Sequence, residues 1–120
     1  MKRRQTGVLG EKLAAELLVD KGYRIVETNF RCPEGEIDIV ARDGDCLVFV
    51  EVRARRSRRF GTPEESITDR KKEHIRSAAA RYHEQREDLP ELWRIDVVAV
   101  EMAGRRLVRV DHIVNAIGDE

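Results

Sequence analysis

Apolar residues recur with two different periods along this chain, and the two periods predict its secondary structure. Spacings of three and four residues indicate one helix near the start of the chain and another in its second half. Short apolar runs bounded by turn residues indicate strands. The predicted helices span 6–21 and 68–85, and the predicted strands span 23–30, 36–42, 46–53, 93–100 and 107–114. Gly22 is expected to end the first helix and Thr68 to cap the second. This αβββαββ order predicts an α/β fold in which helices flank one mixed sheet.

The second and third predicted strands form a hairpin, because the Asp-Gly pair between them is a strong turn signal. We take Asp43 and Gly44 as the two turn residues. Side chains alternate between the faces of a strand, so this register places Glu36 directly opposite Glu51, with Asp38 on the diagonal. The expected Cβ separations are ~5 Å and ~7–8 Å. A slip in the turn would break this alignment.

Carboxylates on core strands require an explanation, because burying an unpaired charge is costly. A divalent cation with oxygen ligands removes that cost. We therefore predict that Asp38 and Glu51 hold Mg²⁺ or Mn²⁺, with Glu36 beside them. Glu11 lies at the edge of the apolar arc of the first helix, and two interpretations are open for it. It either leans over the sheet as a further site acid or interacts with the dipole at the N-terminus of its helix.

The chain carries a local excess of positive charge that its overall composition hides. It has 120 residues, the size of one domain spanning 1–120, and 38% of them are charged, with equal numbers of acids and bases. A basic block beside the acidic cluster suits a polyanion, so nucleic acid is the predicted partner, and a solvated surface is an equally open interpretation. Lys71, at the start of the second helix, is either a phosphate contact or a solvated lysine. The arginines of the basic block are Arg53, Arg55, Arg56, Arg58 and Arg59.

Other segments and residues restrict the class of protein. The apolar runs are shorter than the ~20 residues of a membrane span, and the N-terminus lacks the apolar core of a secretion signal. Cys32 and Cys46 show no zinc-site spacing. We interpret them as free thiols of a cytoplasmic protein without a membrane partner, and a disulfide between them is the less favoured alternative.

A few residues are open to either a structural or a functional interpretation. The histidines His74, His83 and His112 lack ligand spacing and are predicted to be surface or helix residues. Asp96, inside an apolar strand, is predicted to pair with an arginine rather than to join the site. Phe60, within the basic block, either contacts nucleic acid or packs onto its own domain.

The motifs around the predicted hairpin resemble those of a known family. An acid in the first helix, then Asp, then Glu-x-Lys on adjacent strands is the pattern of the PD-(D/E)XK nuclease superfamily, whose restriction-endonuclease fold has an αβββαβ core. Nearly the whole chain is similar to the small bacterial UPF0102 (YraN) family, whose activity is itself inferred from likeness to nucleases such as archaeal Holliday-junction resolvases. The most specific motifs are Gly35-Glu36-Ile37-Asp38-Ile39-Val40 and Phe49-Val50-Glu51-Val52-Arg53, and further matches lie at 10–11, 22–23, 29–31, 60–61, 63–65, 71–72, 79, 82 and 94–98.

The resemblance implies roles for individual residues. Asp38 and Glu51 fall on the metal-binding Asp and Glu of the superfamily, and Glu11 falls on the acid of the first helix. Arg53 stands where the motif usually has Lys. Because an arginine stays protonated, it can clamp a phosphate or stabilise charge but cannot act as a base, which leaves water activation to the metal or to Glu36.

Three functions are compatible with these residues, and the least favoured is a protein-interaction domain whose acids and arginines neutralise one another. The first is a metal-dependent endonuclease that hydrolyses phosphodiester bonds in DNA, with branched DNA as one candidate substrate and DNA favoured over RNA. The second is a catalytically inactive nuclease-fold module that binds nucleic acid. A resolvase-like role would require a two-fold homodimer, so that two strands are cut symmetrically.

Overall fold

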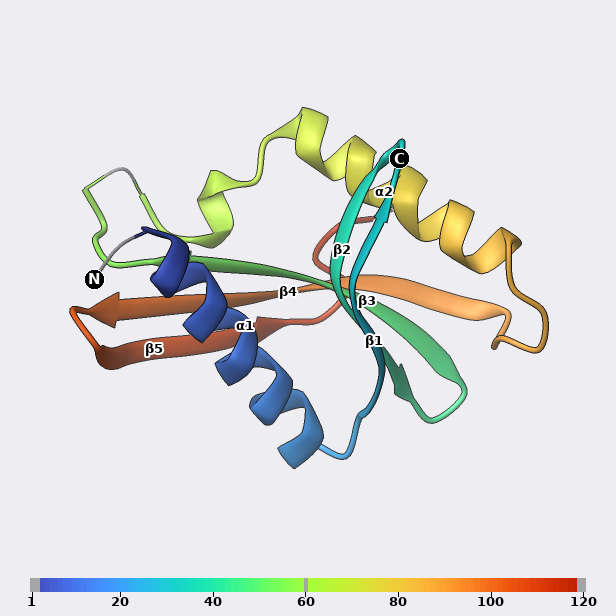
Figure 1. Ribbon diagram of the computed structural model, residues 1–120, viewed down its shortest axis with the longest axis horizontal. Helices are drawn as coiled ribbons and strands as arrows, with labels where there is room; N and C mark the ends of the chain where they lie inside the picture. The colour runs from blue at the N-terminus through green and yellow to red at the C-terminus, as the bar shows by residue number, and fades with distance from the viewer. Residues whose placement is uncertain (1–2, 60, 119–120) are drawn as a thin grey trace.

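Five strands and two helices form the predicted α/β architecture in the computed structural model, which describes residues 3–59 and 61–118, with side chains from Thr6 onward. The elements are α1 (Arg3–Asp20), β1 (Arg24–Cys32), β2 (Gly35–Asp43), β3 (Cys46–Arg55), the 3-10 helix η1 (Glu64–Ser66), α2 (Asp69–Glu84), β4 (Leu92–Ala103) and β5 (Arg106–Ile113). The sheet order is β1-β2-β3-β4-β5, with β3 and β4 parallel and the other neighbours antiparallel (Figure 1). This mixed sheet is consistent with a restriction-endonuclease-like core. Only η1 was not predicted.

The two helices cover opposite faces of the sheet because β2 and β3 bury apolar side chains in both directions (Figure 1). On one face Ala14 and Leu18 of α1 pack against Val48 and Val50 of β3. On the other face Phe49 of β3 belongs to a cluster with the buried side of α2. A strand buried on both faces reads as a continuous apolar run, which is the pattern of 46–53.

The turn between β2 and β3 differs by one residue from the predicted one. Asp43 pairs with Cys46, so the turn residues are Gly44 and Asp45, and Gly44 has a φ of 57° that favours glycine. The predicted pairing of Glu36 with Glu51 was therefore wrong. Moving the turn by one residue shifts the pairing by two positions and leaves each side chain on its face.

As a result Asp38, rather than Glu36, is aligned with Glu51. The hydrogen-bonded ladder ends at Ile39 and Val50, and Asp38 and Glu51 are the next positions on their strands. The two carboxylates therefore lie where β2 begins to separate from β3.

A close approach between α1 and β3 sets the position of the first helix. A Cβ added at Gly10 would lie 2.7 Å from the Cβ of Ala54, so only glycine fits there. One turn earlier, Gly7 has no atom within 4 Å of the same added carbon. Alanine substitutions at Gly10 and Gly7 therefore distinguish the effect of packing against β3 from the effect of helix propensity.

We expect Gly10→Ala to destabilise the protein by roughly 1–3 kcal/mol, because two methyl groups would occupy the space of one. The matched variant Gly7→Ala should stabilise it by ~0.5–1 kcal/mol, since alanine favours the helix and meets no neighbour. Urea unfolding of both variants measures the difference. Equal effects at the two positions would contradict the packing seen between α1 and β3.

Asp96 of β4 is the centre of a buried polar network. Its carboxylate is 0% exposed and accepts hydrogen bonds from Arg94 Nε (3.0 Å), His112 Nε2 (2.8 Å) and the Asn115 N–H (2.9 Å). The predicted pairing of Asp96 with an arginine is confirmed. The prediction for His112 was wrong, because its side chain on β5 is 1% exposed and bonded to Asp96. A histidine on a short edge strand carried no sequence signal of burial.

The structure also bears on the predictions for the cysteines, for Phe60 and for membrane-spanning helices. Cys32 and Cys46 are both free thiols, as expected. Phe60 lies outside the described residues. Within the part of the chain that the structure describes, no helix is long and apolar enough to cross a membrane.

Candidate functional site

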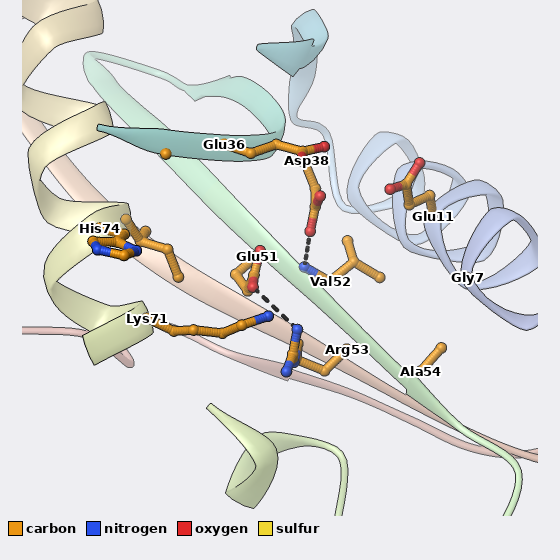
Figure 2. Close-up of a pocket in the computed structure, with 12 residues that line it drawn as sticks. Gly7, Glu11, Glu36, Asp38, Glu51, Val52, Arg53, Ala54, Lys71 and His74 are labelled. Carbon is orange, nitrogen blue, oxygen red and sulfur yellow. Dashed lines mark hydrogen bonds and ion pairs between the residues drawn. The ribbon is translucent and has the colours of Figure 1, made fainter. Parts of the chain in front are cut away.

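A cavity of about 250 Å³ opens at the point where β2 and β3 separate, between α1 and α2 (Figure 2). Four elements contribute to its walls, and four of its side chains are acidic. Its lining consists of Gly7 and Glu11 of α1, Gly35, Glu36 and Asp38 of β2, Glu51, Val52, Arg53 and Ala54 of β3, and Lys71, His74 and Ile75 of α2. Segments far apart in the sequence thus place acids and bases around one space.

Asp38 is held in place by the backbone of the neighbouring strand. The Val52 N–H donates a 2.8 Å hydrogen bond to Asp38 Oδ2 (Figure 2). The β2–β3 ladder ends at the pair Ile39 and Val50, so the Asp38 side chain, rather than the β2 backbone, accepts the hydrogen bond from this β3 amide. The bond orients the Asp38 carboxylate toward β3, beside Glu51.

Glu51 is a buried carboxyl group of the site that is difficult to ionise. The residue is only 9% exposed. Burial raises the pKa of Glu51 well above its usual range, and the neighbouring Asp38 carboxylate raises it further, against the opposing charges of Arg53 and Lys71. Ionising Glu51 therefore calls for an additional positive charge in the cavity.

Arg53 is fixed from the side of η1. Its Nε donates to Ser66 Oγ (3.0 Å) and its Nη2 to the Ser66 carbonyl (3.3 Å), while Nη1 lies 3.6 Å from Glu51 Oε2. The 3-10 helix is itself anchored by Arg109 of β5, whose guanidinium bonds both oxygens of Glu64 at 2.8 and 3.3 Å. Arg53 is thus a positioned cation, and its tether to Ser66 had no signal in the local sequence.

Glu11 and Glu36 complete the acidic side of the cavity. Burial raises the pKa of Glu11, and the charges of Asp38 and Glu36 raise it further, against the lowering effect of Arg31. Of the two interpretations left open for Glu11, the structure favours the one in which it leans toward the sheet. Glu36 lies at the rim, where its half-exposed carboxylate is 3.7 Å from Arg31.

Lys71 and His74 enter the cavity from α2. Thr68 caps this helix by accepting a 3.2 Å hydrogen bond from the Lys71 N–H, as predicted. Figure 2 shows the Lys71 side chain extending toward Glu51 and Arg53. His74 lines the same wall, a position that its spacing in the sequence did not predict.

The donor set fits a small, hard cation. Among residues 3–59 and 61–118 no group of three or more His, Cys, Asp or Glu side chains is arranged to hold a metal ion. Mg²⁺ is commonly bound by one or two carboxylates together with waters and substrate phosphates, rather than by a full protein cage. Asp38 and Glu51 match that pattern, and a cation between them would offset the cost of ionising Glu51.

The arginines that follow Arg53 do not act as one group. Arg55, Arg56 and Arg59 line a second hollow that shares Ala54 with the acidic cavity. Arg58 points elsewhere, with its Nε 2.8 Å from Glu101 Oε1 of β4. The fold therefore divides the predicted basic block: Arg53 and Arg58 are engaged in ion pairs, and Arg55, Arg56 and Arg59 line the second hollow.

Comparisons with known proteins place the chain among uncharacterised bacterial relatives. Residues 10–100 match the model of "Uncharacterised protein family UPF0102". A UPF0102 protein of Dehalococcoides mccartyi is 48% identical over 120 residues, covering 98% of this chain and 97% of its own. One of Moorella thermoacetica is 54% identical over 100 residues, covering 83% of each chain. A third, of Renibacterium salmoninarum, is 47% identical over 109 residues, with 91% and 92% covered. These descriptions name a family and no activity.

Proposed function

The chain belongs to the uncharacterised protein family UPF0102, and from the geometry of its site we propose that it is a metal-dependent endonuclease acting on DNA. One observation carries the proposal. Asp38 and Glu51 meet at the end of a ladder, beside a cavity, with Glu51 buried and difficult to ionise. Without a cation, such a pair lowers the free energy of unfolding at neutral pH, which is expected of a site rather than of a structural contact.

The other residues of the cavity support hydrolysis of a phosphodiester. Asp38 and Glu51 would hold Mg²⁺ or Mn²⁺, which lowers the pKa of a bound water and offsets charge on the phosphate. Arg53, tethered by Ser66, and Lys71 present cations to a phosphate in the same space. Since Arg53 cannot accept a proton, activation of the water would fall to the metal or to Glu36. The resemblance to the PD-(D/E)XK superfamily leads to the same metal-binding roles for Asp38 and Glu51, with Glu11 as the assisting acid of the first helix.

Binding of nucleic acid without hydrolysis is a second candidate function. It is favoured by Arg53, which occupies the place where the superfamily motif usually has Lys. In this case the cavity would bind a phosphate through its cations alone.

A cleavage panel with metal calorimetry tests the proposal. The protein is incubated with Mg²⁺ or Mn²⁺ and branched, flapped, single-stranded and duplex DNA or RNA. We expect metal-dependent cleavage that is lost in Asp38→Ala. The control Asp45→Ala, which removes an exposed acid in the β2–β3 turn, should retain it. Full-rate cleavage by Asp38→Ala would overturn the site, and absence of metal binding at millimolar concentration would favour the second function.

A further inference from the structure

A hollow of about 360 Å³ adjoins the acidic cavity at the end of β3. The two spaces share Ala54 as a lining residue. The side chains of the hollow are of the opposite charge type: Arg55, Arg56 and Arg59 line it, together with Thr6 and Ser57. No acidic residue occurs among its described lining residues. An acidic space that suits a metal thus borders a basic space that suits an anion.

Arg55 and Arg56 differ from Arg53 and Arg58 in what their side chains contact. Arg53 is bonded to Ser66 and Arg58 to Glu101, so both are occupied by partners within the fold. In the described ranges 3–59 and 61–118, the side chains of Arg55 and Arg56 make no hydrogen bond or ion pair, although the Arg55 backbone pairs with β4. A guanidinium that has no protein partner retains its paired N–H donors for a phosphate.

Ion pairs anchor the segment that carries these arginines. Glu101 of β4 accepts from Arg58 at 2.8 Å and from Arg109 of β5 at 3.1 Å, and Arg109 also holds Glu64 of η1. Arg58 is therefore attached to β4, and Glu64 to β5, on either side of Gly61 of the hollow.

We infer that the hollow is a second phosphate subsite, which binds another phosphodiester of the same nucleic-acid strand a few nucleotides from the bond in the acidic cavity. Four residues along a strand, the separation of Glu51 from Arg55, span ~13 Å. A small phosphodiester fills only the acidic cavity, whereas a polymer also reaches the arginines across Ala54. The substrate class is therefore a nucleic-acid strand rather than a mononucleotide or other small phosphodiester. This inference rests on the proposed function for the position of the scissile bond.

Binding measured in chelator tests the subsite without requiring cleavage. A labelled single-stranded oligonucleotide is titrated with the protein at several salt concentrations, using fluorescence anisotropy. We expect the double variant Arg55→Ala/Arg56→Ala to bind roughly tenfold more weakly, with a salt slope reduced by about one to two. The control Arg70→Ala/Lys72→Ala removes the same charge from α2, at a hollow that also contains acids, and should bind like the parent. Thermal melting confirms that both variants are folded.

A second readout separates this inference from the proposed function. In metal, the ratio of oligonucleotide cleavage to cleavage of bis(p-nitrophenyl) phosphate should fall roughly tenfold in Arg55→Ala/Arg56→Ala and stay unchanged in the control. The parent protein could fail to cleave any substrate while Arg55→Ala/Arg56→Ala still loses salt-sensitive binding. That outcome would support the subsite and contradict the proposed hydrolysis. Parental affinity and slope in Arg55→Ala/Arg56→Ala, or an equal loss in the control, would overturn the subsite.

Discussion

Glu51→Gln is expected to abolish metal-dependent cleavage and, in the same molecule, to stabilise the metal-free protein at neutral pH. The loss of activity should be on the order of a thousandfold, because a neutral amide removes one of the two charged oxygen ligands from the proposed cation site. The gain in stability follows from the buried position of Glu51 beside Asp38, which raises its pKa in the folded state. A residue that only packs the core would lose stability on substitution.

The stability change depends on how many protons Glu51 binds in the folded and unfolded states. The unfolded chain loses the Glu51 proton near the ordinary value of 4.5, whereas the folded chain retains it to higher pH. Between those two values the native state binds more protons, so the free energy of unfolding of the parent falls as pH rises. Glutamine does not titrate, and Glu51→Gln should be more stable than the parent by roughly 2 kcal/mol near pH 7 and about equal near pH 4.

Urea unfolding in chelator across this pH range measures the difference. Glu16→Gln, on the exposed side of α1, is a matched control that should leave the pH profile unchanged. Adding Mg²⁺ should raise the melting temperature of the parent and not that of Glu51→Gln, since ligand binding stabilises only a protein that retains the site. A Glu51→Gln variant less stable than the parent at every pH would show that the carboxylate is a structural contact.

Asp96→Ala is expected to have the largest effect on stability, a loss of roughly 3–5 kcal/mol. Lys21 Nζ is 3.0 Å from His112 Nδ1, and an ammonium can only donate, so the His112 proton is on Nε2 and points at Asp96. Removing the Asp96 carboxylate leaves this donor, Arg94 Nε and the Asn115 N–H without their acceptor, whereas the Nη groups of Arg94 retain Asp43 and Tyr23. Unpaired buried donors carry their full desolvation cost.

Chemical denaturation compares this variant with Asp111→Ala on the neighbouring strand. Asp111 is half-exposed and lies 3.3 Å from Arg109, so its removal should cost less than about 1 kcal/mol. Because Asp96 is outside the acidic cavity, the folded fraction of Asp96→Ala should still bind oligonucleotide in chelator. Similar losses of stability for the two aspartates would contradict the network described around Asp96.

Local sequence patterns were sufficient for the order of the elements and for part of the site. Helical and strand periods depend on neighbouring residues, so both helices, all five strands and the Thr68 cap were predicted. Alternation along a strand also placed Asp38 and Glu51 on one face of the sheet. This prediction is correct although the predicted turn was wrong, because a shift of the β2–β3 pairing by two positions leaves each side chain on the same face. The cysteines and the pairing of Asp96 with an arginine were predicted on similarly local grounds.

Only the tertiary structure decided which residues meet. The pairing of Asp43 with Cys46 aligned Asp38 rather than Glu36 with Glu51, because ladder geometry rather than the Asp-Gly signal set the turn. The fold also tethered Arg53 to Ser66 and directed Arg58 to Glu101, contacts between segments whose spacing in sequence carries no period. The sequence by itself thus determined the elements, the family and the two central carboxylates. The cavity around them, and the division of the arginines between ion pairs and an open hollow, depended on long-range packing that no local pattern encodes.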